Sequence, residues 1–206
     1  MQSVKKLGTG FTRFRKKYFG RNRSLFSELV KGQRPKTLVV SCSDSRVDPA
    51  IIFDCRPGEL FIVRNVANLV PPYNPDGGVH GVSAALEFAI RNLKVENIVV
   101  LGHARCGGIQ ALLGRHSGEF VSHWMATAES AKSTALEISK GKSKSIKQRN
   151  CEFEVLKLSY QNLLTFPWIK DKAQKKKLNL LAWYFDLEKG NLLEYSLKTG
   201  TFKSII

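Results

Sequence analysis

The stretch VVSCSDSRVDP, Val39 to Pro49, begins with residues typical of a buried strand and turns polar within three residues. If the chain stays extended beyond the strand, side-chain alternation places Cys42, Asp44 and Arg46 on the same side. A thiol, a carboxylate and a guanidinium at the end of one strand indicate a functional site at that point of the fold.

Strand and helix patterns alternate along the rest of the chain. Short apolar runs indicate strands at residues 36–42, 58–65 and 96–103. Apolar residues at helical spacing indicate a helix over 81–94, and another helix is expected to begin at 107. This alternation predicts an α/β fold with a mainly parallel central sheet and helices on both faces.

The two ends of the chain complete the predicted architecture. Residues 1–31 are basic with apolar spacing, which predicts an N-terminal helical arm. Residues 119–166 indicate two helices around a Lys-rich break at 140–149, and residues 177–197 indicate a strand, a turn and an antiparallel edge strand. We expect residues 1–206 to form a single domain.

The composition narrows the class of protein. The chain has 33 Lys and Arg against 17 Asp and Glu, a net charge of +16. Such charge can attract nucleic acid, but the basic runs lack interleaved aromatic residues and no nucleic-acid module is visible. We therefore expect a solvated basic surface with no specific nucleic-acid partner.

The cysteine count and the hydropathy indicate a cellular location. No apolar run reaches the roughly 18–20 residues that a membrane-spanning helix needs. The four cysteines do not form the dense pattern of a secreted disulfide scaffold. We expect reduced thiols in a cytoplasmic protein that has no membrane partner.

A possible metal site follows from the third predicted strand, which runs into GHARCGG, residues 102–108. Ligands of open α/β sheets bind beyond the carboxyl ends of the strands. If the first and third strands are neighbours, Cys42, His103 and Cys106 meet there, and two thiolates with an imidazole suit Zn²⁺ with one open position. Spacing alone leaves the alternative open that these are core cysteines and a capped loop histidine.

Asp44 and Arg46 favour the metal interpretation. Beside a metal, the carboxylate of Asp44 can orient the water that reacts. The Arg46 guanidinium keeps that carboxylate ionised and stops it from binding the metal itself.

At this point the sequence resembles a known family. The motifs CSDSR, PGELFIVRNVANLV and GHARCGG closely resemble those of the β-class carbonic anhydrases, and GQRPKTLVVSCSDSRV and NLLTFPWI resemble the plant-type branch. The resemblance implies one Zn²⁺ per chain, held by Cys42, His103 and Cys106, and a catalytic dyad of Asp44 and Arg46. It also implies reversible hydration of CO₂ to bicarbonate and a proton, by homodimers or higher homo-oligomers with clefts at the subunit boundary.

The same resemblance implies a substrate pocket. Gln33 matches a glutamine that donates a hydrogen bond to substrate or product, and Gly107 matches a glycine whose N–H faces the cleft. Phe61 and Val66 match apolar residues that line the CO₂ pocket. Phe88 stands where plant-type enzymes commonly carry tyrosine, so a hydroxyl is missing while the apolar wall remains.

Three alternatives compete with this interpretation. A zinc hydrolase of the same fold that acts on CS₂ or COS shares the metal ligands. A basic nucleic-acid-binding protein leaves the Cys–Asp–Arg–His–Cys set unexplained. A thiol phosphatase needs a longer anion loop than the three residues between Cys42 and Arg46.

The residue at position 39 predicts whether the site is inhibited by bicarbonate. Some bacterial relatives have a second, inhibitory bicarbonate site that uses a tryptophan three residues before the first zinc cysteine, where Val39 stands here. Valine has no indole N–H to hold an anion. We therefore expect an open site with Asp44 paired to Arg46.

Overall fold

The computed structural model describes residues 2–20, 24–114 and 118–205. The chain divides into two compact units, residues 1–34 and residues 35–206. All of the metal ligands and the dyad predicted above belong to the second unit. The single domain over residues 1–206, with residues 1–31 as its arm, stays a prediction.

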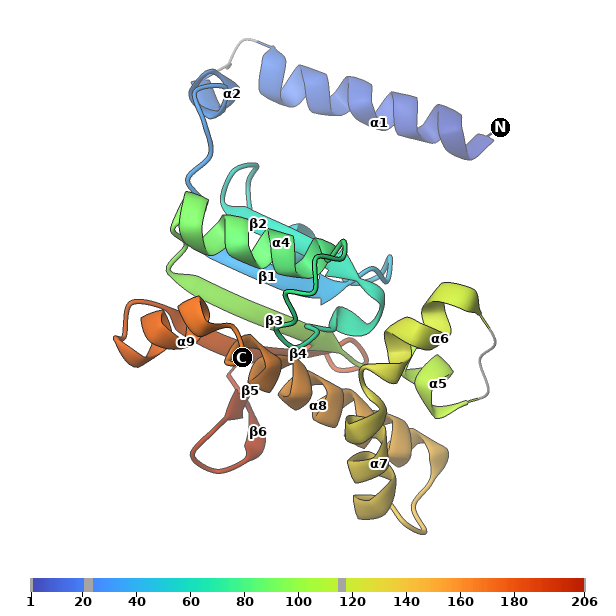
Figure 1. Ribbon diagram of the computed structural model, residues 1–206. Coiled ribbons are helices and arrows are strands. Elements are labelled where there is room, and N and C mark those ends of the chain that lie inside the picture. Colours follow the sequence, from blue (N-terminus) through green and yellow to red (C-terminus); the bar gives the residue numbers. More distant parts are fainter. Residues whose placement is uncertain (1, 21–23, 115–117, 206) are drawn as a thin grey trace. The chain divides into compact units, whose positions relative to one another are not determined.

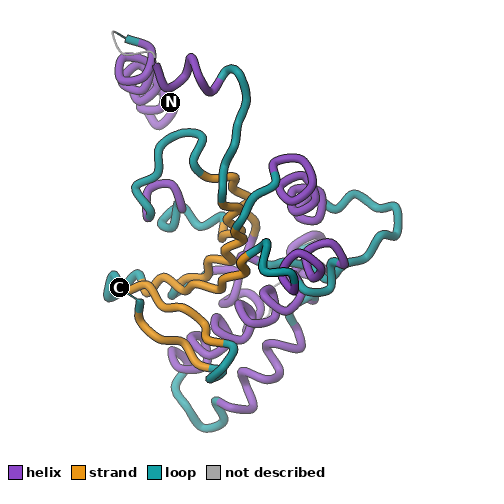
Figure 2. Tube along the Cα trace, turned by 90° about the vertical axis from the view of Figure 1, so that its left-hand side faces the viewer, coloured by secondary structure: helices purple, strands orange, loops and turns teal. Residues whose placement is uncertain are grey.

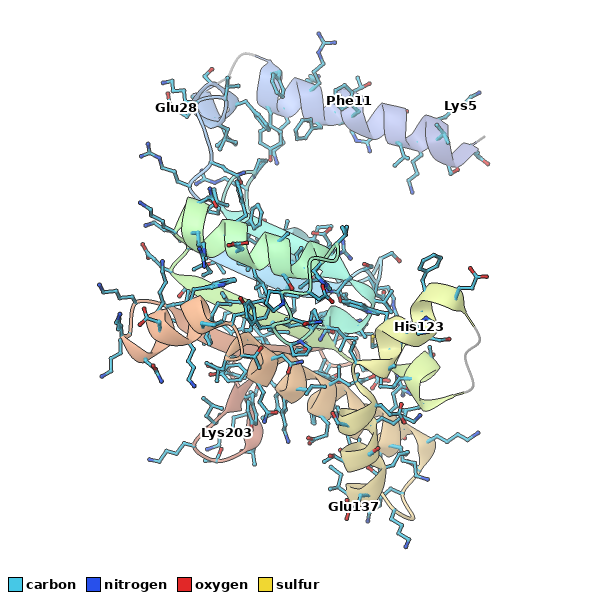
Figure 3. The ribbon with its side chains drawn as sticks, in the orientation of Figure 1. Lys5, Phe11, Glu28, His123, Glu137 and Lys203 are labelled. Atoms are coloured by element: carbon cyan, nitrogen blue, oxygen red, sulfur yellow. The ribbon has the colours of Figure 1, made fainter. Side chains whose placement is uncertain are left out.

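The first unit consists of two helices, α1 (Gln2–Phe19) and α2 (Ser24–Leu29), as expected for a helical arm. Aromatic rings join them: the Phe26 ring lies 5.7 Å from Phe14 and 4.7 Å from Phe19 between centroids. Farther along α1 the apolar side chain of Phe11 and the basic side chain of Lys5 are both exposed (Figure 3).

The second unit is built on a six-stranded sheet in the order β2-β1-β3-β4-β5-β6 (Figure 1). Its strands are β1 (Thr37–Cys42), β2 (Leu60–Asn65), β3 (Asn97–His103), β4 (Asn179–Asp186), β5 (Asn191–Ser196) and β6 (Thr201–Ser204). The first four in spatial order are parallel, and β5 and β6 are antiparallel. The predicted α/β class with a mainly parallel sheet is confirmed, and β6, a strand not predicted from the sequence, extends the antiparallel edge.

The helices cover the two faces of this sheet unequally, as Figure 2 shows. On one face α4 (Gly81–Glu87), α8 (Lys144–Leu163) and α9 (Pro167–Gln174) pack against the main core. On the other face the short helix α3 (Pro49–Ile52) contributes Ile52, which packs near Val39, Val99 and Leu101. Side chains alternate between the two faces along β1. Leu38 and Val40 therefore belong to the main core, whereas Val39 packs on the opposite face with Val99 and Leu101.

Two helical regions differ from their sequence predictions. Residues 119–166 contain three helices, α6 (Glu119–Ala126), α7 (Glu129–Ile138) and α8, because the backbone leaves helical geometry at Ala128 (φ −108°, ψ 11°). The Lys-rich break is shorter than expected because Ser143 caps α8, its hydroxyl accepting a hydrogen bond from the Ile146 N–H. The predicted helix over 81–94 is α4, which continues as a wider π-helical segment, Phe88–Leu93.

The remaining helical segments are α5 (Gly107–Leu113) and the single turn η1 (Val66–Asn68), both at the carboxyl ends of strands. Among the described residues, no helix combines the length and hydrophobicity that crossing a bilayer requires.

Candidate metal centre

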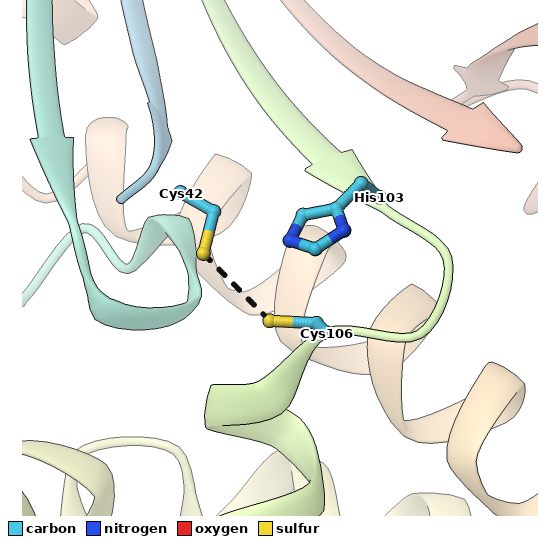
Figure 4. Close-up of side chains that lie close together, drawn as sticks. All are labelled: Cys42, His103 and Cys106. Carbon is cyan, nitrogen blue, oxygen red and sulfur yellow. Dashed lines mark hydrogen bonds between the residues drawn. The ribbon is translucent and has the colours of Figure 1, made fainter. Parts of the chain in front are cut away.

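Three metal-ligating side chains converge at the carboxyl edge of the sheet (Figure 4). Cys42 is the last residue of β1 and His103 the last residue of β3, and these strands pair directly with each other. Cys106 follows three residues later, directly before α5. Their ligand atoms all lie within 4.8 Å of one another, and the two sulfurs are 3.8 Å apart. We call Cys42, His103 and Cys106 the metal centre.

The imidazole of His103 is prepared for a metal. Its Nδ1 donates to the Ala104 carbonyl at 2.9 Å, so the Nε2 lone pair faces the two sulfurs. His103 is 1% exposed, and no described residue offers Nε2 a hydrogen bond. Buried polar atoms are rarely left without a partner, and a metal ion satisfies this one. The donor set fits Zn²⁺, which binds two thiolates and an imidazole and keeps one position open in catalytic sites.

The two thiols share their protons unequally. The contact with Cys106 lowers the pKa of Cys42, although burial acts in the opposite direction. The pKa of Cys106 is raised by its contact with Cys42 and by burial. Two thiolates this close repel each other, and a divalent cation between them removes that penalty.

Asp44 and Arg46 form a bidentate ion pair beside the centre. Arg46 Nε donates to Oδ1 at 2.9 Å and Nη2 donates to Oδ2 at 2.7 Å, and the Arg46 backbone N–H also donates to Oδ1 at 3.0 Å. These bonds hold the pKa of Asp44 well below its usual range. Asp44 Oδ2 lies 4.0 Å from His103 Nε2.

The reason for this proximity differs from the sequence-based argument. The sequence predicts an extended segment that aligns residues 42, 44 and 46, but β1 ends at Cys42 and residues 45–46 form a turn. Arg64 on β2 fixes the start of the turn. Its Nε donates to the Cys42 carbonyl at 2.9 Å, its Nη2 to the Asp44 carbonyl at 2.6 Å, and its Nη1 to Asp48 at 2.9 Å.

A glycine allows α5 to approach η1. A Cβ on Gly108 would lie 2.8 Å from a methyl group of Val66 and 2.9 Å from the Cβ of Ala67. Val66 thus lies against α5, one residue beyond Asn65, which pairs with Cys42 in the sheet. Gly107 has open space where a Cβ would be, so its backbone is accessible at the start of α5.

The other predicted pocket residues do not gather at the metal centre of this chain. Phe61 pairs in register with Leu38, four residues before Cys42, which is roughly 13 Å along the strand. The Phe61 ring stacks against Phe88 with a centroid distance of 5.9 Å, and Phe88 is 44% exposed. Gln33 belongs to the other compact unit.

A buried carboxylate that was not predicted from the sequence lies beside the centre. Glu152 on α8 is 5% exposed and accepts a hydrogen bond from the Cys106 N–H at 3.1 Å. Burial raises the pKa of its carboxyl group. The available signal was the position of Glu152 on the same helix face as the apolar residues Cys151, Val155 and Leu156 of α8.

A mainly parallel sheet with two cysteines and a histidine at its carboxyl edge defines a zinc-binding α/β enzyme. The comparisons with known proteins specify the family. The family model described as "Carbonic anhydrase" matches residues 37–192. "Beta carbonic anhydrase 3" of Arabidopsis thaliana is 38% identical over 208 residues, covering 97% of this chain and 80% of that protein. The chain therefore belongs to the β-carbonic anhydrase family.

Solved structures agree with this assignment. The structure of the β-carbonic anhydrase CcaA matches with a TM-score of 0.94 at 30% identity, covering 100% of this chain and 93% of that one. Tetrameric β-carbonic anhydrases from Sordaria macrospora share the fold, with a TM-score of 0.81 at 24% identity and 98% of each chain covered. The protein is thus a carbonic anhydrase whose Cys–His–Cys centre takes Zn²⁺ as cofactor.

Proposed function

We propose that this chain catalyses the reversible hydration of CO₂ to bicarbonate and a proton, with Asp44 and Arg46 as its catalytic dyad. The observation that carries the proposal is the bidentate pair, which keeps an ionised carboxylate 4.0 Å from His103 Nε2, an atom with no hydrogen-bond partner in the described part of the chain. Both oxygens of Asp44 already accept hydrogen bonds from Arg46, so the pairing opposes a move of the carboxylate onto the metal.

The chemistry divides between cofactor and side chains. When bound, Zn²⁺ supplies Lewis-acid activation of water, which makes hydroxide available near neutral pH. Asp44 accepts a hydrogen bond from the reacting water. This bond orients the water so that a lone pair of its oxygen faces the substrate. Arg46 holds Asp44 in its ionised form, and its Nη2 is itself fixed by the Arg105 carbonyl at 3.0 Å.

CO₂ is small and apolar, so its pocket needs apolar walls with few polar groups. We infer that Val66 forms the wall next to α5, that the Gly107 N–H faces the cleft, and that Gln33 donates a hydrogen bond to substrate or product. Phe61 and Phe88 form a stacked, partly exposed pair away from the metal centre of their own chain. They suit a wall that one subunit contributes to the cleft of another.

We accordingly propose a homo-oligomer, at least a dimer, with clefts at the subunit boundary. The Sordaria macrospora relatives are tetrameric. We further propose a cytoplasmic protein with no membrane partner and no specific nucleic-acid partner. Its four cysteines are free, which suits a reducing compartment.

The test combines metal analysis with kinetics on the purified protein. We expect about one Zn²⁺ per chain and rapid CO₂ hydration in a stopped-flow assay with a pH indicator. Hydrolysis of CS₂ and COS is measured in parallel, and CO₂ should be the preferred substrate. A zinc-loaded protein that hydrolyses CS₂ or COS and leaves CO₂ unchanged would refute the proposal and favour the hydrolase of the same fold.

A further inference from the structure

A buried hydrogen-bond network lies against the metal centre and has no part in the chemistry described above. Its central group is the carboxyl group of Glu152. Oε1 accepts from the Cys106 N–H at 3.1 Å and from Gln148 Nε2 at 2.9 Å, and Oε2 accepts from the Tyr184 hydroxyl at 2.7 Å. These three donors, a backbone amide, a side-chain amide and a phenol, are uncharged, so they orient the carboxyl group without neutralising it.

The donor that matters most is the Cys106 N–H, because Cys106 ends a turn that needs support. Arg105 has φ 57°, in the left-handed region that is unfavourable for a residue with a side chain. The Ala104 N–H is fixed by the Phe185 carbonyl at 3.0 Å. Glu152 fixes the other end of the turn, at the residue that carries the metal-binding sulfur.

We propose that Glu152 is a positioning residue for the zinc site. The reach of its carboxyl group to the Cys106 N–H, rather than its charge, sets the direction of the Cys106 sulfur and slows release of the metal. Gln148, one helical turn before Glu152, and Tyr184 on β4 hold the carboxyl group at that reach. Groups that orient metal ligands in this way typically change metal affinity or activity by about 10- to 100-fold when removed.

Two conservative variants separate reach from charge. Glu152→Gln removes the charge and keeps an acceptor oxygen at the same distance. Its new amide group can donate a hydrogen bond to the Tyr184 hydroxyl, because a hydroxyl can act as acceptor as well as donor. Glu152→Asp keeps the charge but withdraws the carboxyl group by about one C–C bond, roughly 1.5 Å. Glu152→Ala removes the acceptor altogether.

The matched control is Glu154→Gln on the same helix. Glu154 lies two residues away and pairs with Lys157 at 2.7 Å, outside the network around Cys106. It therefore reports what the loss of a carboxylate from α8 does when the metal centre is not involved.

The experiment measures release of Zn²⁺ from the loaded protein to a chromophoric chelator, and the visible absorption spectrum of the Co²⁺-substituted protein. Glu152→Asp and Glu152→Ala should release zinc on the order of 10 to 100 times faster than the unchanged protein and shift the thiolate-to-cobalt band. Glu152→Gln and Glu154→Gln should retain the unchanged rate and spectrum. Thermal unfolding of the metal-free proteins shows how much each variant alters the fold itself.

If Glu152→Ala does not fold, Glu152→Asp carries the test. Zinc release at the unchanged rate in Glu152→Asp overturns the proposal. Release from Glu152→Gln as fast as from Glu152→Asp also overturns it, because reach would then not be the deciding property. Since the readout is metal release, the outcome does not depend on the catalytic roles proposed for Asp44 and Arg46.

Discussion

Arg46 donates to both carboxylate oxygens of Asp44, through Nε at 2.9 Å and through Nη2 at 2.7 Å. The same Nη2 donates to the carbonyl of Arg105, the residue before Cys106, at 3.0 Å. The ion pair thus connects the turn that follows Cys42 with the turn that joins His103 to Cys106. Removing either partner tests a different part of this arrangement.

Asp44→Ala should retain about one Zn²⁺ per chain and lose activity, because the metal ligands lie elsewhere while the acceptor for water is gone. We expect kcat to fall by about 100-fold or more. Stopped-flow CO₂ hydration and metal analysis on the same sample check this. As control, Asp171→Asn removes an exposed carboxylate that pairs with Lys175, and should change neither quantity. Loss of zinc in Asp44→Ala would show that Asp44 builds the site.

Arg46→Ala should lower kcat at least as far as Asp44→Ala. Without its two hydrogen bonds the Asp44 carboxylate is free to bind the metal and exclude water. The double variant Asp44→Ala/Arg46→Ala should then be no slower than Arg46→Ala alone. A crystal structure of zinc-loaded Arg46→Ala in which Asp44 remains away from the metal would contradict this explanation.

The first three strands and the meeting of Cys42 with His103 could be predicted from the sequence. Each apolar run is bounded by polar or turn residues, and parallel neighbouring strands bring their carboxyl ends to one edge. The strand β6 could not be predicted, because its short, mostly polar sequence TFKS is held by long-range packing of Phe202, whose ring lies 4.2 Å from Phe153.

The position of Glu152 at the site shows the same limit. Its partners Cys106 and Tyr184 are 46 and 32 residues away in the chain. Only the packing of α8 against β3 and β4 brings them together, and no local pattern encodes that packing. A carboxylate in an apolar stripe marks an unusual residue, but the sequence does not say what the residue contacts.

Cys106→Ser should lose zinc and activity together, because a serine hydroxyl is a poor substitute for a thiolate ligand. The matched control is Cys55→Ser. Cys55 is a free, half-buried thiol whose Sγ lies 3.6 Å from the Phe53 carbonyl. Zinc content by mass spectrometry should remain unchanged in Cys55→Ser. Full zinc occupancy in Cys106→Ser, or metal loss in Cys55→Ser, would mean that the wrong thiol has been assigned.

Gly108→Ala should destabilise the protein by about 1–3 kcal/mol, because the added methyl group overlaps Val66 and Ala67. Gly107→Ala is the matched comparison for stability, since open space surrounds its new Cβ. Chemical denaturation of the two variants should separate them clearly. Equal stability would show that η1 moves away from α5 at little cost.

The pH–rate profile should fall at low pH as a single ordinary titration, without a cooperative collapse. Position 39 is a valine, which has no indole N–H to hold an inhibitory bicarbonate as some bacterial relatives do. Val39 is also buried, 1% exposed, and packs with Val99 and Leu101.

Hydrogen bonds from Arg46 hold the pKa of Asp44 well below its usual range. A depressed carboxyl pKa means that the stability from the ion pair is fully present above the ordinary value of 3.8 and is lost only as pH falls through the depressed value. The open arrangement with Asp44 paired to Arg46 should therefore persist from about pH 5 upward. A steep profile with bicarbonate inhibition, or a structure near neutral pH with Asp44 bound to zinc, would contradict this prediction.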